Sequence, residues 1–516
     1  MSMNAKKRLS INTLFNAISQ FWMMGISIFL TPFIIHDLGN ELFGYWVLFA
    51  VISGYCTLID MGIGVSLVRF FSEYNTKKDI EGFNKILNTG FTFNLIVSLA
   101  FFVLIILSPQ IMSIVNVSEN FYKEVIIAFC LNLVAGIVAN QFGAFQAIIA
   151  GLQRYDITNK IQLISSVPYI FGTVLVLYLN LGIIWLAVVN GICIIFQVVL
   201  YMKYAYKLKS GLTFRPLQFH MPTFRLLFGY GIKVKVSNLS DVFNFQLDNL
   251  LLGMMVGPLK VTTYEVGAKI TRFVRSLSLW LLPAVVPASA ELAAAKDYYR
   301  IQILYEKGSR YLFAMVIPTV TFTLLTSGLL IYTWLGPGYR ESASLVIVLL
   351  LGYTANIMTG IGSMILRGIG KPQYEMRSKV ITIVLNLSLS ILLILKYGIW
   401  GAVIGTTLAM VIGSSYFFYL YHLHMAVPFL DLFKKGIYKP LLASLISGFA
   451  VFTLNRFLHY DSRIMAGIIL FFDMFLFGGF YFIFLFILRF FDNEEKVFAK
   501  EFKRYLLNKT LPWLSS

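Results

Sequence analysis

The chain of 516 residues is 58% hydrophobic and only 13% charged. A soluble globular domain has about 45–50% apolar and about 25% charged residues. Because the excess of apolar residues extends along the whole chain, it excludes a soluble protein and indicates an integral membrane protein that crosses the bilayer many times. The formal net charge of +18 does not indicate nucleic-acid binding, since cytoplasmic loops of membrane proteins collect lysine and arginine.

The first apolar segment resembles a signal peptide in having basic residues before it. It runs from about residue 12 to 36 without a small-residue cleavage site, so we expect a retained first span. Segments of about 19 or more apolar residues then follow one another along the chain. Fourteen transmembrane helices are predicted, at about 12–36, 42–66, 86–108, 122–149, 160–179, 182–203, 226–254, 260–286, 308–333, 342–366, 376–396, 399–421, 438–456 and 464–488.

The positive charges predict which side of the membrane each loop faces. Of the 42 lysines and arginines, 31 lie in the loops and termini on one side, six lie in the loops on the other side, and five lie at membrane depth. Cytoplasmic loops carry the excess of positive charge. We therefore expect both termini to be cytoplasmic.

Features of an enzyme are missing from the sequence. Every loop on the outer side is too short to fold as a catalytic domain, and the chain has no phosphate-binding P-loop, HExxH or GxSxG motif. Cys56, Cys130 and Cys193 lie inside apolar segments without the spacing of metal ligands. We expect neither an enzyme nor a protein that holds a metal or cofactor.

An internal repeat with a constant offset of 218 residues connects the two parts of the chain. The matched pairs include Gly39 with Gly257, Lys78 with Lys296, and Asp79 with Asp297. Six predicted spans separate equivalent positions, so the two copies have the same orientation in the membrane, as in transporters built from parallel repeats.

The repeat predicts an all-α fold with two six-helix lobes. We expect an N-terminal lobe at 1–209, a C-terminal lobe at 210–425, two extra helices at 426–490, and a basic cytoplasmic tail at 491–516.

Three motifs carry a resemblance to a known superfamily. They are "QLDNLLLG" at 246–253, "GPLKVTTYEVGAKI" at 257–270, and "LRGIGKPQYEMRSKV" followed by "LKYGIWGAVIGTTLA" within 366–409. Together with the two six-helix lobes, they resemble the multidrug/oligosaccharidyl-lipid/polysaccharide exporter superfamily, and the last motif is similar to its polysaccharide-flippase branch. The resemblance covers about residues 10–490.

The resemblance implies a function in the bacterial plasma (inner) membrane. A flippase of this branch translocates an undecaprenyl-diphosphate-linked oligosaccharide, such as an O-antigen, capsule or exopolysaccharide unit, from the inner to the outer leaflet. It does so by alternating access of the two lobes, coupled to a gradient of protons or sodium ions. The implied partners are the lipid-linked oligosaccharide, membrane lipids and the glycan polymerase machinery.

Five cations at membrane depth fit a diphosphate substrate. Lys269, Arg272 and Arg275 are spaced three apart, and this spacing places them within an arc of about 120° on one helix. Each would cost roughly 2.5–3.5 kcal/mol at the centre of a lipid-exposed helix, so we expect them to face a water-filled cavity. Arginine makes bidentate phosphate contacts and lysine provides a point charge. Glu265 lies four residues before Lys269 and can neutralise it locally.

The preceding span adds the other two cations and two acids. Lys233, Asp241 and Asp248 fall on one face of the predicted helix, and Lys235 points elsewhere. Both lysines are candidates for substrate contact, with snorkelling to the inner surface as the alternative. Asp241 and Asp248 are expected either to pair with the arginines or to bind a coupling ion. Asp60 is expected either to line the cavity or to lie at the membrane surface.

Two other transport functions remain open from the sequence. A flippase for lipid II, the cell-wall precursor, would recognise the same diphosphate group and differ only in the sugar. A cation-coupled exporter of drugs or metabolites would favour an acidic or aromatic cavity, and the five cations argue against it.

Overall fold

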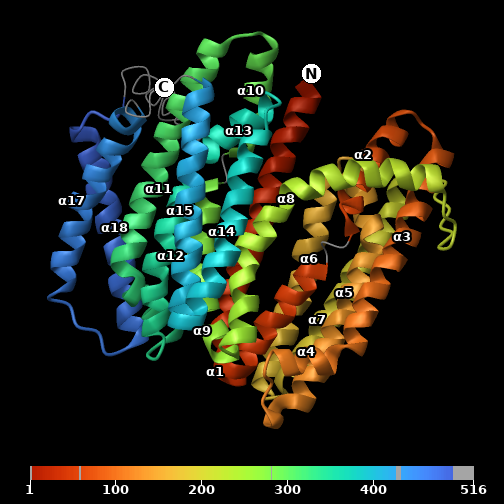
Figure 1. Ribbon diagram of the computed structural model, residues 1–516, viewed down its shortest axis with the longest axis horizontal. Helices are drawn as coiled ribbons and strands as arrows, with labels where there is room; N and C mark the ends of the chain where they lie inside the picture. The colour runs from red at the N-terminus through yellow and green to blue at the C-terminus, as the bar shows by residue number, and fades with distance from the viewer. Residues whose placement is uncertain (1–2, 57–59, 280–281, 426–431, 492–516) are drawn as a thin grey trace, which may run out of the picture. The chain divides into compact units, whose positions relative to one another are not determined.

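The computed structural model describes residues 3–56, 60–279, 282–425 and 432–491, and within them only the backbone of 3–17, 233–245 and positions 56, 279 and 435. The expected basic tail at 491–516 lies, from 492 on, outside the described residues. The regular secondary structure of the described part is helical throughout, without a β-strand, as the sequence predicts (Figure 1).

Contacts within the chain divide it into two compact units. The first comprises residues 1–269 and 379–409, and the second comprises 270–378 and the chain from 410 on. The first unit contains α1 (Met3–Cys56), α2 (Ile63–Thr76), α3 (Ile80–Ile106), α4 (Ser108–Ile114), η2 (Glu119–Phe121), α5 (Tyr122–Gly151), α6 (Tyr155–Tyr178), α7 (Gly182–Leu208) and α8 (Met221–Met255). The second contains η3 (Leu282–Ala284), α10 (Val285–Ala294), α11 (Tyr298–Leu335), α12 (Arg340–Met358), α13 (Gly360–Gly368), η4 (Phe433–Ile437), α17 (Tyr438–Asn455) and α18 (Arg463–Ile487).

Three helices contribute to both units: α9 (Pro258–Leu279), α14 (Gln373–Tyr397) and α15 (Ile399–Met425). The lobes at 1–209 and 210–425, which the internal repeat predicts, follow a different division and stay a prediction.

Eleven segments of the described chain are long and apolar enough to cross a membrane. One of them, Ile18–Tyr55, overlaps both of the first two predicted spans. The predicted spans at 226–254 and 438–456 form helices α8 and α17 but are not among the eleven. The multi-spanning all-α architecture is therefore confirmed, whereas the number of fourteen is not.

Helices are interrupted at similar places in the two copies of the repeat. Gly39 interrupts α1 with a φ of 78°, and the second part of α1 ends at Cys56, earlier than the predicted end at 66. The short helix α2 follows, and its first turn is preceded by Met61 and Gly62, both with positive φ. In the second copy, α9 ends at Leu279 and the short helix α10 follows.

Local backbone conformations recur at the 218-residue offset that the sequence predicts. The left-handed φ of Gly39, Lys78 and Asn180 is matched by that of Gly257, Lys296 and Gly398. Asp79 caps α3 by accepting a hydrogen bond from the Gly82 amide, and Asp297 caps α11 in the same way from Arg300. Because these features require particular turns and caps, their recurrence supports a duplicated fold.

Within the first unit, α2 and α8 cross at very close range. A Cβ atom on Gly62 would lie 2.2 Å from the carbonyl oxygen of Gly231, and one on Gly231 would lie 2.7 Å from that of Gly62. Ser66 Oγ lies 2.7 Å from the Leu227 carbonyl oxygen across the same contact. Small residues let helix backbones approach in this way, so the start of α8 is held against α2.

The linker between the two predicted lobes is attached to α3. Asn84 donates to the carbonyl oxygen of Gly211 and accepts from the amide of Thr213. Asn88, one turn further along α3, donates to the Thr213 carbonyl oxygen and accepts from the Arg215 amide at 2.7 Å. The extended chain that leads into α8 therefore has its backbone groups satisfied by one face of α3.

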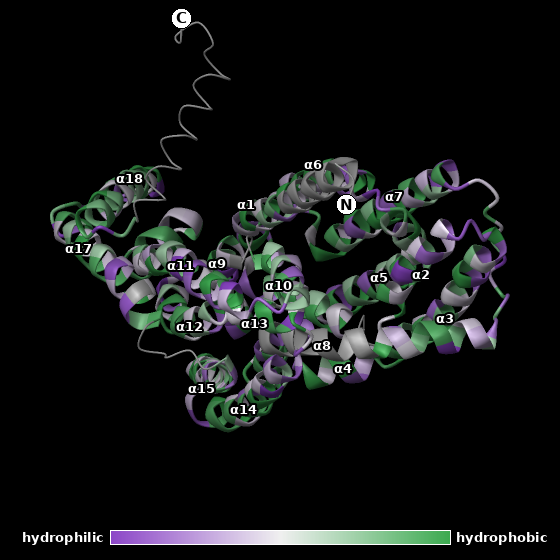
Figure 2. Cartoon of the chain, turned by 90° about the horizontal axis from the view of Figure 1, so that it is seen from above, coloured by the Kyte–Doolittle hydropathy of each residue, from purple (hydrophilic) through white to green (hydrophobic). Residues whose placement is uncertain are grey.

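In the second unit, the hairpin of α17 and α18 packs on α11 (Figure 1). Hydrophobic residues predominate along both helices of the hairpin (Figure 2). One side of the contact is an apolar cluster that includes Val451, Phe477 and Tyr481. The Tyr481 hydroxyl donates to the Ala314 carbonyl oxygen of α11 at 2.6 Å, so the hairpin is attached to α11 by apolar packing and by a polar contact.

Candidate functional site

Two polar pairs lie across the hairpin of α8 and α9. The hairpin turns at Gly257, whose φ of 117° strongly favours glycine. Tyr264 of α9 donates to Asp248 of α8 at 2.5 Å, and Asn249 of α8 donates to Glu265 of α9 at 2.9 Å. Both pairs are buried, and by helix rise they lie about 10–14 Å from the turn. The hairpin thus carries two acids into the interior of the first unit.

The hairpin of α14 and α15 brings further polar groups to the same place. It turns at Gly398, and its two helices touch at Gly401 and Gly405. A Cβ atom on Gly401 would lie 2.2 Å from the Leu393 carbonyl group, and one on Gly405 would lie 2.8 Å from Ser390. Because of this close approach, polar side chains of both helices meet in the core of the hairpin.

A buried group of oxygen atoms surrounds Asp248, which is 2% exposed. Its Oδ2 accepts hydrogen bonds at 2.5 Å from both Tyr264 and Thr406, and its Oδ1 lies 3.4 Å from the Ser390 hydroxyl. Asn386 Oδ1 lies 2.9 Å from Ser390 Oγ and 3.2 Å from Thr406 Oγ1. Below, we call these five side chains the Asp248 cluster.

The chemistry of the Asp248 cluster suits a proton or a small hard cation. The donors to the carboxylate that the structure describes are neutral hydroxyl groups, which stabilise a negative charge without cancelling it. A buried carboxylate is costly unless it is paired or neutralised. Hydroxyl, amide and carboxylate oxygens are also the ligand types that hard cations prefer.

Lys269 is directed towards α1. Its Nζ donates to Thr31 Oγ1 at 2.7 Å and lies 5.5 Å from the centre of the Phe43 ring. Thr31 in turn donates to the Ser27 carbonyl oxygen at 2.6 Å. Lys269 is half-buried, and its ammonium group is held by α1.

Arg272 and Arg275 follow Lys269 on the next turns of α9, and both are half-buried. The helix is continuous from Pro258 to Leu279, so the predicted arc of cations is retained. By contacts, Lys269 belongs to the first compact unit and the two arginines belong to the second. Their contact with substrate stays a prediction.

Of the remaining predicted site residues, the structure describes the side chain of Asp60 but not those of the three residues in α8. The side chains of Lys233, Lys235 and Asp241 lie outside the described residues, although all three positions are in α8. Asp60 lies in the break between α1 and α2, where its Oδ1 accepts a hydrogen bond from the Gly62 amide at 3.0 Å. This contact positions the turn into α2.

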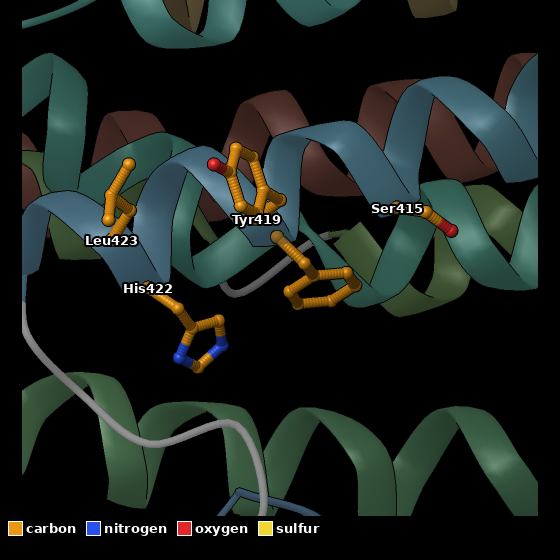
Figure 3. Close-up of a pocket in the computed structure, with 5 residues that line it drawn as sticks. Ser415, Tyr419, His422 and Leu423 are labelled. Atoms are coloured by element: carbon orange, nitrogen blue, oxygen red, sulfur yellow. The ribbon is translucent and has the colours of Figure 1, made fainter.

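A cavity of about 490 Å³ borders α15 in the second unit. The residues lining it that the structure describes are Ser415, Phe418, Tyr419, His422 and Leu423. In Figure 3, His422 projects from the opposite side of the helix from Tyr419 and Leu423. The lining is aromatic and aliphatic rather than charged, so this cavity has the character of a site for apolar groups.

A polar cluster lies at the end of the same helix. His424 Nε2 lies 2.8 Å from Lys371 Nζ, and its Nδ1 lies 3.3 Å from the Tyr374 hydroxyl. Arg367 makes a bidentate pair with Glu375, with both distances 2.6 Å. His424 therefore connects the end of α15 to the loop before α14 and to the first turn of α14, and the Arg367–Glu375 pair connects α13 to α14.

Sequence reasoning found Asp248 but missed the hydroxyl and amide groups around it. Tyr264, Ser390, Thr406 and Asn386 come from three helices, and each is a common residue in an apolar span. One signal was present: Ser390 and Thr406 lie at equal distances along the chain from Gly398, and Asp248 and Tyr264 lie at nearly equal distances from Gly257. Residues at equal distances from a tight turn face each other across a hairpin.

Comparison with known proteins agrees with this architecture. Residues 38–344 match the polysaccharide biosynthesis protein family. The chain belongs to the polysaccharide biosynthesis protein family. The matched region begins in α1 and ends in α12, and so includes the hairpin of α8 and α9.

Relatives of this polysaccharide biosynthesis protein include transporters and flippases. A putative O-antigen transporter of Shigella flexneri is 25% identical over 403 residues, which are 75% of this chain and 92% of that protein. A probable low-salt glycan biosynthesis flippase, Agl15, of Haloferax volcanii is 24% identical over 257 residues, which are 48% of this chain and 52% of that protein.

Solved structures show the fold of this family member. The lipid II flippase MurJ in an inward closed conformation superposes with a TM-score of 0.71 at 16% identity, covering 92% of this chain and 99% of that one. An inward-facing multidrug resistance transporter of the same superfamily has a TM-score of 0.67 at 13% identity, covering 81% and 97%. These solved structures show the fold, the family match agrees with the predicted polysaccharide branch, and the protein is a multi-pass membrane protein.

Proposed function

We propose that this protein is a flippase that moves an undecaprenyl-diphosphate-linked oligosaccharide from the inner to the outer leaflet of a bacterial plasma membrane, with both termini in the cytoplasm. Family membership and the named relatives support a glycan-directed transporter. Alternating access of the two repeat-related lobes, 1–209 and 210–425, is the mechanism we assign to it.

The observation that carries the proposal is the row of cations on α9. Lys269, Arg272 and Arg275 are half-buried and share one arc of a continuous helix. A diphosphate carries negative charge and acceptor oxygens, which guanidinium groups bind in a bidentate manner and an ammonium group binds as a point charge. A transporter for cationic drugs would gain nothing from such a row.

We further propose that the Asp248 cluster binds the coupling ion, a proton or a sodium ion. The cluster is buried, has one carboxylate, and connects the α8–α9 hairpin to the α14–α15 hairpin. The cations are on the same helix as Tyr264. A movement of α9 when an ion binds next to Tyr264 would therefore also move the proposed substrate contacts.

Removal of both arginine charges tests the proposal. We expect the double variant Arg272→Ala, Arg275→Ala to lose at least 90% of surface-glycan export while its amount in the membrane stays unchanged. The matched control is Lys77→Ala, Lys85→Ala, which removes two exposed cations that pair with Glu73 and Glu81 and should export normally. Normal export by the arginine variant would remove both residues from the mechanism.

The same experiment can separate glycan export from lipid II transport. The wild-type gene should restore surface glycan to a strain that lacks its glycan flippase, and should not restore growth to a strain that lacks its lipid II flippase. Rescue of growth alone would assign the protein to cell-wall synthesis instead.

A further inference from the structure

The buried face of α18 contains one acidic residue. Its stripe consists of Ala466, Ile469, Asp473, Phe477, Tyr481 and Leu485. Asp473 is only 1% exposed and lies within a helix that is apolar enough to cross the membrane. Between such neighbours an ionised carboxylate is strongly disfavoured, and acids in membrane spans are rare unless they have a function.

Asp473 has the side-chain amide of Asn455 as a hydrogen-bond partner, but among the described residues one oxygen atom of each side chain has no donor. Asn455, the last residue of α17, donates from Nδ2 to Asp473 Oδ2 at 2.8 Å. The other carboxylate oxygen, Asp473 Oδ1, and the amide oxygen, Asn455 Oδ1, are both buried and have no hydrogen-bond donor among the described residues. Two acceptor oxygens thus lack a hydrogen, although buried polar atoms in proteins are nearly always paired.

The charged and titratable groups of the surrounding helices have other partners. Three cations donate to backbone carbonyl oxygens: Lys439 of α17 to that of Arg489, Arg463 of α18 to those of Thr333 and Trp334, and Arg310 of α11 to that of Phe490. Tyr481 donates to the Ala314 carbonyl oxygen, the Tyr332 and Tyr460 rings are tilted against each other with centroids 5.0 Å apart, and Arg456 lies over the Phe452 ring. None of these contacts supplies a counter-charge to Asp473.

We propose that Asp473 and Asn455 form a proton-binding site, in which the Asp473 carboxyl group is protonated at neutral pH and donates from Oδ1 to Asn455 Oδ1. One proton supplies the hydrogen that both oxygens lack, and the two side chains then form a cyclic acid–amide pair with two hydrogen bonds. Loss of the proton leaves a buried carboxylate opposite an amide oxygen. The packing of α17 against α18 is therefore linked to proton occupancy, whatever substrate the protein transports.

Infrared difference spectroscopy tests the protonation directly. We expect the spectrum of the wild-type protein in detergent, minus that of Asp473→Asn, to contain the carbonyl stretch of a protonated carboxylic acid at every pH from 6 to 8. Asparagine is the matched control, because its amide can form the same two hydrogen bonds with Asn455 without a titratable proton. A difference spectrum with only carboxylate bands in this range would overturn the proposal.

A second variant tests the assigned acceptor and does not depend on removal of the acid. In Asn455→Leu we expect the same carbonyl band at a higher frequency, since the carboxylic acid has lost its hydrogen-bond partner. An unchanged band would show that Asn455 is not the partner, and would likewise overturn the proposal.

Stability provides an independent measurement. An aspartate in an unfolded chain releases its proton near pH 4, so the folded protein binds one more proton than the unfolded protein at neutral pH. Linkage then requires stability to fall as pH rises. We expect the melting temperature of the wild type to fall from pH 6 to pH 8 relative to that of Asp473→Asn, and parallel curves would contradict the site.

Discussion

Two buried aspartates in different surroundings illustrate how local chemistry sets the role of a residue. Asp248 receives hydrogen bonds from Tyr264 and Thr406 at 2.5 Å, so neutral hydroxyl groups surround its carboxylate. Asp473 has one amide donor, and its other carboxylate oxygen has no donor among the residues that the structure describes; there we propose a protonated acid. The same residue type therefore suits exchange of an ion in one place and a closed helix contact in the other.

At this scale the substitution Asp248→Asn tests ion coupling. Asparagine still accepts hydrogen bonds from the hydroxyl groups but can neither release a proton nor offset the charge of a sodium ion. We expect export to lose its dependence on the proton or sodium gradient, with a rate at least tenfold lower when the gradient is present. Glycan export by inverted membrane vesicles, with and without each gradient, measures this.

A suitable control is Asp156→Asn. Asp156 is half-exposed and pairs with Arg154 at 2.9 Å, so its loss should leave both the rate and its gradient dependence unchanged. If Asp248→Asn keeps the wild-type response to both gradients, the coupling ion binds elsewhere.

At the scale of the element, close helix contacts decide where polar residues meet. Gly401 and Gly405 are four residues apart and form one side of the α14–α15 contact, a spacing that lets helices in membranes approach closely. Without this approach, Ser390 and Thr406 would not both reach Asp248. The same principle holds α2 against α8 at Gly62 and Gly231.

The substitution Gly401→Ala should separate α14 from α15. Its Cβ atom would fall 2.2 Å from the backbone of Leu393, and backbone cannot move aside as a flexible side chain can. We expect a loss of about 1–3 kcal/mol or more in stability, as for overpacked cores, with lower export. Thermal unfolding in detergent gives the first quantity and the glycan export assay gives the second.

Gly478→Ala in α18 is the matched control. An added Cβ atom at Gly478 meets nothing within 4 Å, and alanine is better than glycine in a helix by about 0.5–1 kcal/mol. Gly478→Ala should therefore be as stable as the wild type or slightly more stable. Equal stability of the two variants would show that the α14–α15 contact adapts to the extra atom.

At the scale of the whole molecule, the internal repeat and the distribution of positive charges both predict that the two copies have the same orientation in the membrane. The turns at Gly39 and Gly257, and the caps at Asp79 and Asp297, recur at one offset. Parallel copies would place equivalent loops on the same side of the membrane, and the predicted spans place most of the positive charges in the loops of one side.

Site-directed labelling tests this orientation. In a background with the native cysteines replaced by alanine, Lys78→Cys and Arg340→Cys should differ in intact spheroplasts. We expect a membrane-impermeant maleimide to label position 340 and to label position 78 only after the membrane is opened, because the charge distribution places position 78 in the cytoplasm. Labelling of position 78 from outside would reverse the topology.

The sequence alone determined the class of the protein and its repeat. Long apolar segments can satisfy their backbone in a membrane only as helices when strand alternation is missing, so composition was enough for the all-α architecture. The repeat was visible because turns and caps demand particular residues, such as Gly257 and Asp297. The cations on α9 were found because a charge in an apolar span is conspicuous.

Only the tertiary structure decided which polar residues meet. Ser390, Thr406 and Asn386 are uncharged and inconspicuous in their spans, and they gain meaning because two hairpins bring them to Asp248. Asp473 was not among the predicted site residues, and its contact with Asn455 follows from packing. The hydrophobicity of a segment depends on its own residues, so it can be judged from the sequence. A hydrogen bond depends on the distance and direction between two atoms, and only the folded chain brings such atoms together.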